Sequence, residues 1–246
     1  MKVKNISKVF RNQSGKIDVL QNISFDLEEG EILAIVGPSG CGKTTLLNIL
    51  ASFESPTNGK IILEESDNKL GYLFQTPALL PWKNILDNVL IGLKVQNNLN
   101  DATKKKAIHL LKRYGLSEFE KEYPSTLSGG MRQRVAFVRT MITEPTMLLL
   151  DEPFSSLDYE KKLKMELFTY EYIKEKKLSA ILVTHDIDEA IALADRILVF
   201  SQRPARILSE QKITINNLNP VQRREHATFG SYFKKIWVKM DLETNN

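Results

Sequence analysis

The chain alternates between continuous apolar runs and longer segments in which apolar residues recur at helical spacing. Continuous apolar runs are typical of strands that are buried on both faces of a sheet, and they occur at 32–36, 146–150, 180–184 and 196–200. Helical spacing predicts helices at 85–95, 159–176 and 187–194. Strands and helices that alternate in this way predict an α/β fold, in which helices cover both faces of a mostly parallel sheet.

The N-terminal part follows a different pattern, with short strands and turns in place of the strand–helix alternation. Apolar residues among lysines predict an edge strand at 3–10, and the polar segment 11–16 predicts a turn. Alternating apolar and polar residues then predict a half-buried strand at 23–27. Two further short strands are expected at 60–63 and 71–74. The N-terminus should therefore form an antiparallel β part.

A helical block interrupts the strand-rich pattern in the middle of the chain. No convincing strand occurs between 75 and 145, whereas helical spacing continues in 131–142. Asp101 predicts a helix cap, and Gly115 predicts the end of the same helix. We therefore expect a helical subdomain at about 77–143, inserted into the strand-rich core.

The C-terminal segments complete the expected organisation. Residues 206–215 are weakly strand-like, and a polar helix is expected from Pro220 onward. With the helical block set aside, the core takes in about 1–76 and 144–246. The whole chain, 1–246, then forms a single domain.

Composition narrows the class of protein without naming a function. Hydrophobic residues make up 42% of the 246 residues and charged residues 26%, as in soluble globular proteins. No apolar run approaches the roughly 20 residues that span a bilayer, and no signal core follows the N-terminus. The single cysteine excludes an internal disulfide, and the net charge of +4 is too small to indicate nucleic-acid binding. These features predict a cytosolic protein with no nucleic-acid partner.

The stretch 37–45, Gly-Pro-Ser-Gly-Cys-Gly-Lys-Thr-Thr, fits the phosphate-loop pattern between a predicted strand and a predicted helix. Its glycines let backbone N–H groups turn toward one anion at the positive end of the helix. We expect Lys43 to reach the β and γ phosphates, and the Thr44 hydroxyl to hold Mg²⁺. A plain glycine turn would not require Lys-Thr here. The expected nucleotide-binding residues are Gly37, Ser39, Gly40, Cys41, Gly42, Lys43, Thr44 and Thr45.

The apolar run near 147–150 ends in two acids, Asp151 and Glu152. Beside a phosphate loop, the first acid is expected to hold Mg²⁺. The second is then placed to take a proton from an attacking water, which makes Glu152 the candidate general base. The alternative is a pair of solvated acids at the end of a strand, which would be the better interpretation without the phosphate loop.

A second candidate anion site lies at Leu127-Ser-Gly-Gly-Met131, just before a predicted helix. Ser128 can cap this helix, and Gly129 and Gly130 expose backbone N–H groups at its positive end. An ordinary N-cap would need the serine but not the two glycines.

Taken together, these motifs resemble the nucleotide-binding subunit of an ATP-binding-cassette (ABC) transporter over nearly the whole chain. They follow the family's order as Walker A, Q-loop, signature, Walker B, D-loop and H-loop, at 37–45, Gln75, 127–131, 147–152, 155–158 and His185. Each motif alone has modest specificity, but six in order are highly specific.

The resemblance implies a head-to-tail homodimer, in which each ATP lies between one subunit's Walker A and the other's signature. It implies that Gln75 touches Mg²⁺ and the attacking water, that His185 contacts the γ-phosphate, and that Asp158 links the two sites. Ser128, Gly129 and Gly130 would contact the γ-phosphate in trans. Outside this motif set, Gln75 would be a plain loop residue and His185 a helix cap.

Adenine needs an aromatic or apolar platform, and the resemblance assigns this role to Phe10. The alternative is a core or edge phenylalanine. Cys41 is expected to be a small filler that points away from phosphate. Met131 replaces the family's usual glutamine, but only its backbone N–H is needed.

Three local features narrow the branch of the family: the segment 79–82, which ends in Trp82, Met131 in the signature, and 203–205 after the last core strand. Together they resemble importers of the nitrate, sulfonate and taurine group, which includes transporters of vitamin-precursor pyrimidines. Alternatively, Trp82 is a packed loop aromatic.

This branch implies partners: integral membrane permease subunits, an indirect extracytoplasmic solute-binding protein, and a peripheral place on the cytoplasmic face of the membrane. Its substrate would be a small anion, a sulfonate or a vitamin-precursor-like solute.

Other classes of nucleotide-binding protein remain as alternatives. A soluble ABC ATPase of repair or translation would carry coiled coils or two cassettes, and an ABC exporter ATPase would share the same motifs. A GTPase would need an Asn-Lys-x-Asp guanine reader, and the segment 68–71 lacks the aspartate. A small-molecule kinase would not need the signature.

Overall fold

A computed structural model describes residues 1–12, 15–63, 69–155, 157–215 and 217–244 of the chain. Its centre is a six-stranded sheet in the order β5-β6-β7-β3-β8-β9. The first five strands run parallel, and β9 (Ile207–Lys212) pairs antiparallel with β8 (Arg196–Phe200). The mostly parallel α/β class predicted from the sequence is confirmed.

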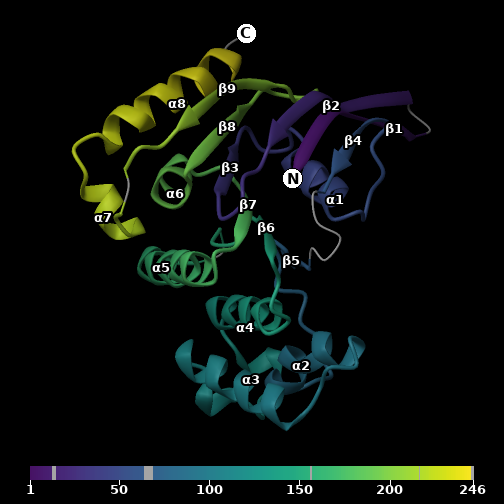
Figure 1. The fold of residues 1–246 in the computed structure, drawn as a ribbon, viewed down its shortest axis with the longest axis vertical. Helices are drawn as coiled ribbons and strands as arrows, with labels where there is room; N and C mark the ends of the chain where they lie inside the picture. Colours follow the sequence, from purple (N-terminus) through teal and green to yellow (C-terminus); the bar gives the residue numbers. More distant parts are fainter. Residues whose placement is uncertain (13–14, 64–68, 156, 216, 245–246) are drawn as a thin grey trace.

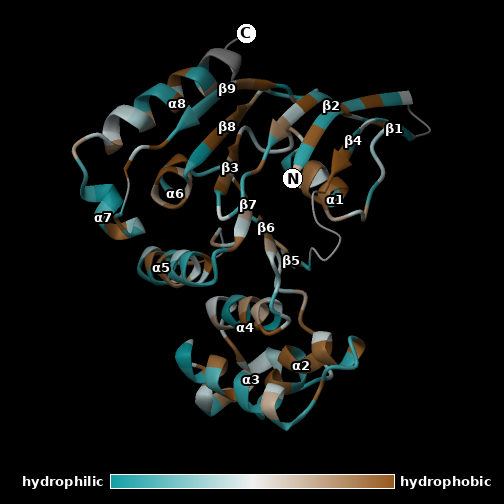
Figure 2. Cartoon of the chain, in the orientation of Figure 1, coloured by the Kyte–Doolittle hydropathy of each residue, from teal (hydrophilic) through white to brown (hydrophobic). Residues whose placement is uncertain are grey.

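The central strands of this sheet are buried along their whole length. They are β3 (Ile32–Val36), β6 (Met147–Asp151) and β7 (Ser179–Thr184), and every residue in each of them is buried. Figure 2 shows these strands as an apolar centre, as expected for strands covered on both faces. The apolar runs therefore predicted these three strands to within one residue at either end.

Helices cover both faces of the six-stranded sheet (Figure 1). The helix α1 (Lys43–Leu50) follows β3 directly, and its apolar residues join the core beneath the N-terminal strands. The helices α5 (Tyr159–Lys176) and α6 (Ile187–Leu193) belong to the second core cluster. Both were predicted from their periodicity, α5 with the same bounds.

The N-terminal part is a separate three-stranded antiparallel sheet in the order β2-β1-β4. Here β1 (Lys2–Asn12) is the central strand, so its prediction as an edge strand was wrong. The second neighbour, β4 (Asn58–Ile62), joins from a distant part of the sequence, which a local pattern does not reveal. The turn predicted at 11–16 is also mostly strand, because β1 continues to Asn12 and β2 (Gly15–Asp26) begins at Gly15. Residues 13–14 lie outside the described residues.

The middle of the chain is helical and lies at the far end of the long axis from the two sheets (Figure 1). It contains α2 (Ile85–Val95), α3 (Asp101–Arg113), two short 3-10 turns, η1 (Ser117–Phe119) and η2 (Pro124–Thr126), and α4 (Gly129–Met141). The strand β5 (Leu70–Leu73) precedes this part and belongs to the main sheet.

Two helix starts differ from the predictions. Asn100, not Asp101, caps α3, because its side chain accepts the Thr103 N–H while the Thr103 hydroxyl accepts the Asn100 N–H. The helix α4 begins at Gly129, two residues before the predicted 131, and the predicted cap at Ser128 is confirmed. The reciprocal cap of α3 and the single cap of α4 both satisfy free N–H groups at a helix start.

The C-terminal segment forms two helices rather than the single predicted one. They are α7 (Pro220–Glu225) and α8 (Phe229–Thr244), separated by His226, which has an extended backbone. The aromatic rings of Phe233 and Trp237 stack one turn apart on α8, as their spacing indicated. None of the helices in the described residues combines the length and apolar character that crossing a membrane requires.

Candidate functional site

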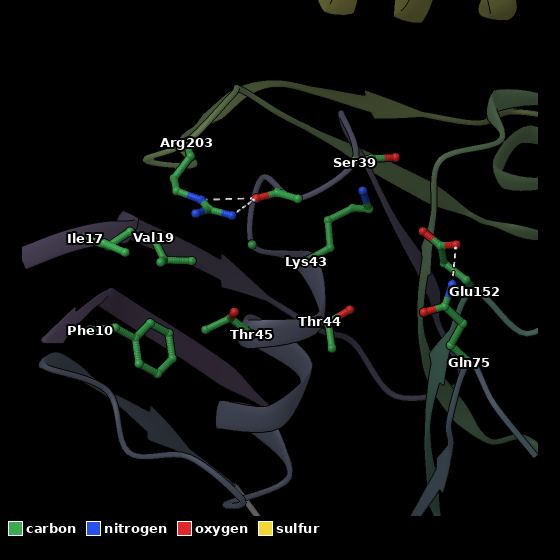
Figure 3. A pocket seen from close by; sticks show the side chains of 12 residues that line it. Phe10, Ile17, Val19, Ser39, Lys43, Thr44, Thr45, Gln75, Glu152 and Arg203 are labelled. Carbon is green, nitrogen blue, oxygen red and sulfur yellow. Dashed lines mark hydrogen bonds between the residues drawn. The ribbon is translucent and has the colours of Figure 1, made fainter. Parts of the chain in front are cut away.

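A pocket of about 510 Å³ opens where the phosphate loop meets the N-terminal sheet (Figure 3). Phe10 and Ile17 line it from one side, on the hairpin of β1 and β2. Gln75 and Glu152 line it from the opposite side, and Lys43 lies between them at the start of α1. The pocket therefore brings together residues from five segments that are distant in the sequence.

The phosphate loop has the shape of an anion cradle. Gly42 has a φ of 126°, and an added Cβ would lie 2.9 Å from Val19 Cγ1, so both the conformation and the close packing require glycine. Gly42 caps α1 without any side-chain hydrogen bond. The first N–H groups of α1 therefore remain available for a phosphate.

Lys43 stabilises this loop from inside. Its side chain is buried, and its ammonium donates to the carbonyl oxygens of Gly37 at 2.8 Å and Pro38 at 3.0 Å. Beside it, the Cys41 thiol is 2% exposed, and burial raises its pKa. The sulfur is therefore a packing atom in the core beneath the N-terminal strands.

Thr44 and Asp151 approach each other at the end of β6. The Thr44 hydroxyl donates to Asp151 Oδ1 at 3.0 Å, and the Tyr72 hydroxyl lies 3.5 Å from Asp151 Oδ2. Burial raises the pKa of Asp151, and the neighbouring charge of Glu152 acts in the same direction. A bound cation would offset both effects.

This donor set fits Mg²⁺. A hydroxyl and a carboxylate are hard oxygen ligands, and Mg²⁺ is usually held by one or two carboxylates together with substrate phosphates. In the residues that the structure describes, no group of three or more His, Cys, Asp or Glu side chains could hold a metal ion by itself. The phosphates of a nucleotide would therefore have to complete the coordination.

Glu152 is held from two sides. Gln75 Nε2 donates to its Oε2 at 3.2 Å, and His185 Nδ1 lies 3.2 Å from its Oε1. Its backbone has a φ of 43°, in the left-handed region that is unfavourable for a glutamate, and its N–H donates to the Val183 carbonyl. Strain of this kind concentrates at functional sites. The three predicted catalytic side chains thus meet at one carboxylate.

Phe10 is neither a core residue nor fully exposed. Its ring is 38% exposed, and the Lys8 ammonium lies 4.7 Å from the ring centroid. Ile17 faces it across the hairpin, where the two residues are paired in register. The ring therefore offers an open aromatic surface at the edge of the pocket, close to Thr45 in Figure 3.

The signature residues lie elsewhere. Ser128 is exposed and caps α4, accepting the Met131 N–H at 3.3 Å. A Cβ on Gly130 would lie 3.0 Å from Leu157, so packing explains this glycine, whereas a Cβ on Gly129 would meet nothing closer than 4.0 Å. Within the described part of the chain, no residue of 127–131 lines the pocket beside the phosphate loop.

The D-loop and the H-loop follow the signature in the chain, and each lies next to the start of a helix. Asp158 caps α5 by accepting the Lys161 N–H at 3.1 Å, and it also pairs with the Lys161 ammonium. His185 is not a helix cap, since Asp186 caps α6 in its place. The D-loop residue 156 lies outside the described residues.

Sequence reasoning missed part of the pocket. Arg203, noted only as a mark of the branch, donates from Nη2 to the Gly40 carbonyl at 2.6 Å and lines the pocket (Figure 3). Val19 packs against Gly42 from β2. Neither residue belongs to a motif, so their roles depend on contacts that no local pattern reveals.

The strand, the glycine loop with its lysine, and the acidic strand end with its held glutamate define a phosphate-loop ATPase. Residues 20–155, more than half of the chain, match the family model described as ABC transporter. The chain belongs to this family of ATPases, and ATP is its nucleotide.

The most informative similarities extend over nearly the whole chain. The "Uncharacterized ABC transporter ATP-binding protein YtlC" of Bacillus subtilis (strain 168) is 41% identical, over 97% of this chain and 95% of the relative. The "Aliphatic sulfonates import ATP-binding protein SsuB" of Bacillus thuringiensis subsp. konkukian (strain 97-27) is 36% identical, over 95% of this chain and 93% of the relative.

A solved structure has the same fold. The structure titled "Dimeric structure of a post-hydrolysis state of the ATP-binding cassette MJ0796 bound to ADP and Pi" has a TM-score of 0.78 and 30% sequence identity. The match covers 86% of this chain and 98% of that chain. The cassette fold predicted from the motif order is therefore confirmed.

Proposed function

We propose that this chain hydrolyses Mg-ATP between two head-to-tail copies of itself and thereby energises a membrane importer of sulfonate-like anions. The observation that carries the catalytic part is the meeting of Gln75 and His185 on the two oxygens of Glu152, 3.2 Å from each. A carboxylate held in this way at the edge of a phosphate-loop pocket is suited to act on a water molecule at the γ-phosphate.

The chemistry follows from the positions of the side chains. Glu152 orients the attacking water and takes its proton, while Gln75 and His185 keep the carboxylate in place. When ATP binds, the Lys43 ammonium gives up its hydrogen bonds to the Gly37 and Pro38 carbonyls and binds the β and γ phosphates instead. Thr44 and Asp151 hold Mg²⁺, which supplies positive charge where negative charge develops. Phe10 offers its open face to the base.

The signature needs a ligand from another molecule. The chain itself does not explain Gly129 by packing, and the N-terminus of the 13-residue helix α4 is exposed at Ser128. In a twofold dimer the same two surfaces meet twice, so each signature reaches the partner's nucleotide. The solved relative is described as dimeric and bound to ADP and Pi, which supports a nucleotide-bound dimer.

The membrane partner would meet exposed aromatic side chains that precede and follow Gln75 in the chain. Trp82 is 71% exposed and Phe53 is 63% exposed, and the rings of Phe53 and Phe74 stack at 6.1 Å. Arg139 donates to the Ala78 carbonyl at 2.8 Å and fixes the loop that carries Trp82. Exposed aromatic side chains are enriched at protein interfaces. The chain would thus sit peripherally on the cytoplasmic face of the membrane, beside permease subunits.

The substrate class is inferred from the relatives and from the local features of the branch. One relative is described as an importer ATPase for aliphatic sulfonates. The segments 79–82 and 203–205 are the features that first indicated this branch. The permease and an extracytoplasmic solute-binding protein, not this chain, would select the molecule.

The test is purification of the chain from its native membrane in mild detergent, followed by reconstitution of the complex in vesicles. A co-purified permease and ATP-dependent uptake of an alkanesulfonate support the proposal, with the Glu152→Gln complex as the control without turnover. Uptake of nitrate alone, or of a pyrimidine alone, would replace the sulfonate by another substrate of the same branch. A chain that never co-purifies with a membrane protein would favour a soluble ABC ATPase instead, and outward transport would favour an exporter.

A further inference from the structure

A second cavity, of about 170 Å³, adjoins Glu152 and His185 on the side of α5 and α6. Besides Glu152, three charged side chains line it: Lys162 in the first turn of α5, and Asp186 and Glu189 at the start of α6. None of the six family motifs contains Lys162 or Glu189. Both residues nevertheless line the same cavity as Glu152 and His185.

Lys162 joins the two helix starts. Its ammonium lies 2.6 Å from Asp186 Oδ2 and 3.0 Å from Glu189 Oε2, and its side chain is only 15% exposed. On the far side, Glu166 Oε1 lies 3.9 Å away, while the other oxygen of Glu166 pairs with Arg224 from α7 at 2.7 Å. Lys162 is therefore the cation between the carboxylates of α5 and α6.

The pKa of Glu189 and the pKa of Lys162 each depend on the charge of the other group. Burial raises the pKa of Glu189 to about 7, against the opposing effect of Lys162. Burial works against the Lys162 ammonium, but the Glu189 and Asp186 carboxylates outweigh it and raise its pKa. Because Glu189 is 2% exposed, removal of Lys162 would leave a buried carboxylate without its nearest cation.

The salt bridges of Lys162 are connected to the candidate site through the backbone at the starts of α5 and α6. The Lys162 N–H donates to the Asp158 carbonyl at 2.8 Å, at the loop expected to meet the partner subunit. Asp186 directly follows His185, and its N–H donates to the Thr184 hydroxyl at 3.0 Å. The His185 side chain is 52% exposed, so little packing fixes it apart from its contact with Glu152.

We propose that Lys162 is a positioning residue for hydrolysis: through Asp186 it fixes His185 against Glu152, and it ties this pair to the D-loop at the start of α5. The inference rests on the proposed function, because it assumes that Glu152 acts on water and that His185 supports it. Lys162 itself touches neither nucleotide nor water.

The test compares four single variants of the full chain, and the double variant that combines Lys162→Met with Asp186→Asn, in ATP binding and steady-state hydrolysis. Lys162→Met removes the cation, and Asp186→Asn removes the anion but keeps an oxygen that can cap α6. Lys162→Arg restores the charge. Lys164→Met is the matched control, because Lys164 lies on the same helix in an exposed pair with Glu160.

We expect Lys162→Met and Asp186→Asn each to lower kcat about tenfold, less than the roughly hundredfold that a misplacement of about 1 Å can cause. KM for ATP should change less than about twofold, since neither residue meets the nucleotide. The kcat of the double variant should be no lower than that of the less active single variant, because both changes break the same interaction. Lys162→Arg and Lys164→Met should remain near wild type.

An unchanged kcat in Asp186→Asn, additive losses in the double variant, or a rise in KM alone would overturn the inference. If Lys162→Met does not fold, adding Glu189→Gln removes the buried charge that it would leave behind. Normal hydrolysis by Glu152→Gln would instead contradict the proposed function itself. The two failures are therefore distinguishable in one set of measurements.

Discussion

Replacement of Glu189 by glutamine should change how the free energy of unfolding depends on pH. Glu189 is 2% exposed on α6 and faces Lys162 and Glu166 from α5, Asp186 from its own helix, and Arg224 beyond Glu166. Burial raises its pKa from 4.5 to about 7. In the unfolded chain the group ionises at its ordinary value.

The sign and size of the effect follow from this difference. The protonated carboxyl is favoured in the folded state, so its contribution to stability is complete below pH 4.5 and is lost as pH rises through about 7. Each unit of pKa corresponds to about 1.4 kcal/mol. The folded protein should therefore lose about 2–3 kcal/mol between about pH 5 and pH 8 because of Glu189. Glutamine does not titrate and loses nothing.

Urea denaturation followed by circular dichroism at several pH values measures the effect. The stability of Glu189→Gln relative to wild type should rise steadily from about pH 5 to about pH 8. Glu160→Gln is the matched control, because the hydrogen bond from Lys164 lowers the pKa of the exposed Glu160 and its effect has the opposite sign. A difference for Glu189→Gln that stays constant or falls with pH would refute the reasoning.

Three further predictions concern the nucleotide, the metal and the partner. Phe10→Ala should weaken ATP binding by about 1–3 kcal/mol, as for other base–aromatic stacks, and an unchanged dissociation constant in calorimetry would remove Phe10 from the site. Asp151→Asn should raise the Mg²⁺ concentration needed for half-maximal hydrolysis, whereas ATP binding in excess chelator should match wild type; an unaltered Mg²⁺ titration contradicts this. Trp82→Ala should disturb assembly or transport more than the ATPase rate of the isolated subunit, and equal loss of both with the partner still bound would contradict it.

Much of the fold could be predicted because its strands and helices carry strong local patterns. The run at 32–36 and the periodicity of 159–176 gave the bounds of β3 and α5. The place of β1 within its sheet could not be predicted, because β4 pairs with it from about 50 residues away. The break between α7 and α8 was missed, because His226 carries no glycine or proline signal.

The site shows the same division. Lys43, Thr44 and Asp151 belong to motifs whose chemistry requires those residue types, so the sequence alone predicts their roles, and the structure brings Thr44 and Asp151 within hydrogen-bond distance. Arg203 and Lys162 take part through contacts with residues more than twenty positions away, and surface lysines and arginines are common in any sequence. Their roles appear only when the fold brings Arg203 to the Gly40 carbonyl and Lys162 to the Asp186 and Glu189 carboxylates.

The central claim is that ATP joins two copies of the chain, with Glu152 as the base that ends this state. Glu152→Gln keeps the size of the side chain and removes its basic carboxylate, so hydrolysis should fall by roughly two to four decades while binding survives. The direct measurement is size-exclusion chromatography of this variant with Mg-ATP and with Mg-ADP, beside a second protein that also carries Ser128→Arg. We expect a dimer with ATP, monomers with ADP, and monomers under both conditions when Ser128→Arg blocks the exposed end of α4. A Glu152→Gln protein that stays monomeric with ATP, or a Ser128→Arg protein that still dimerises, would contradict the account.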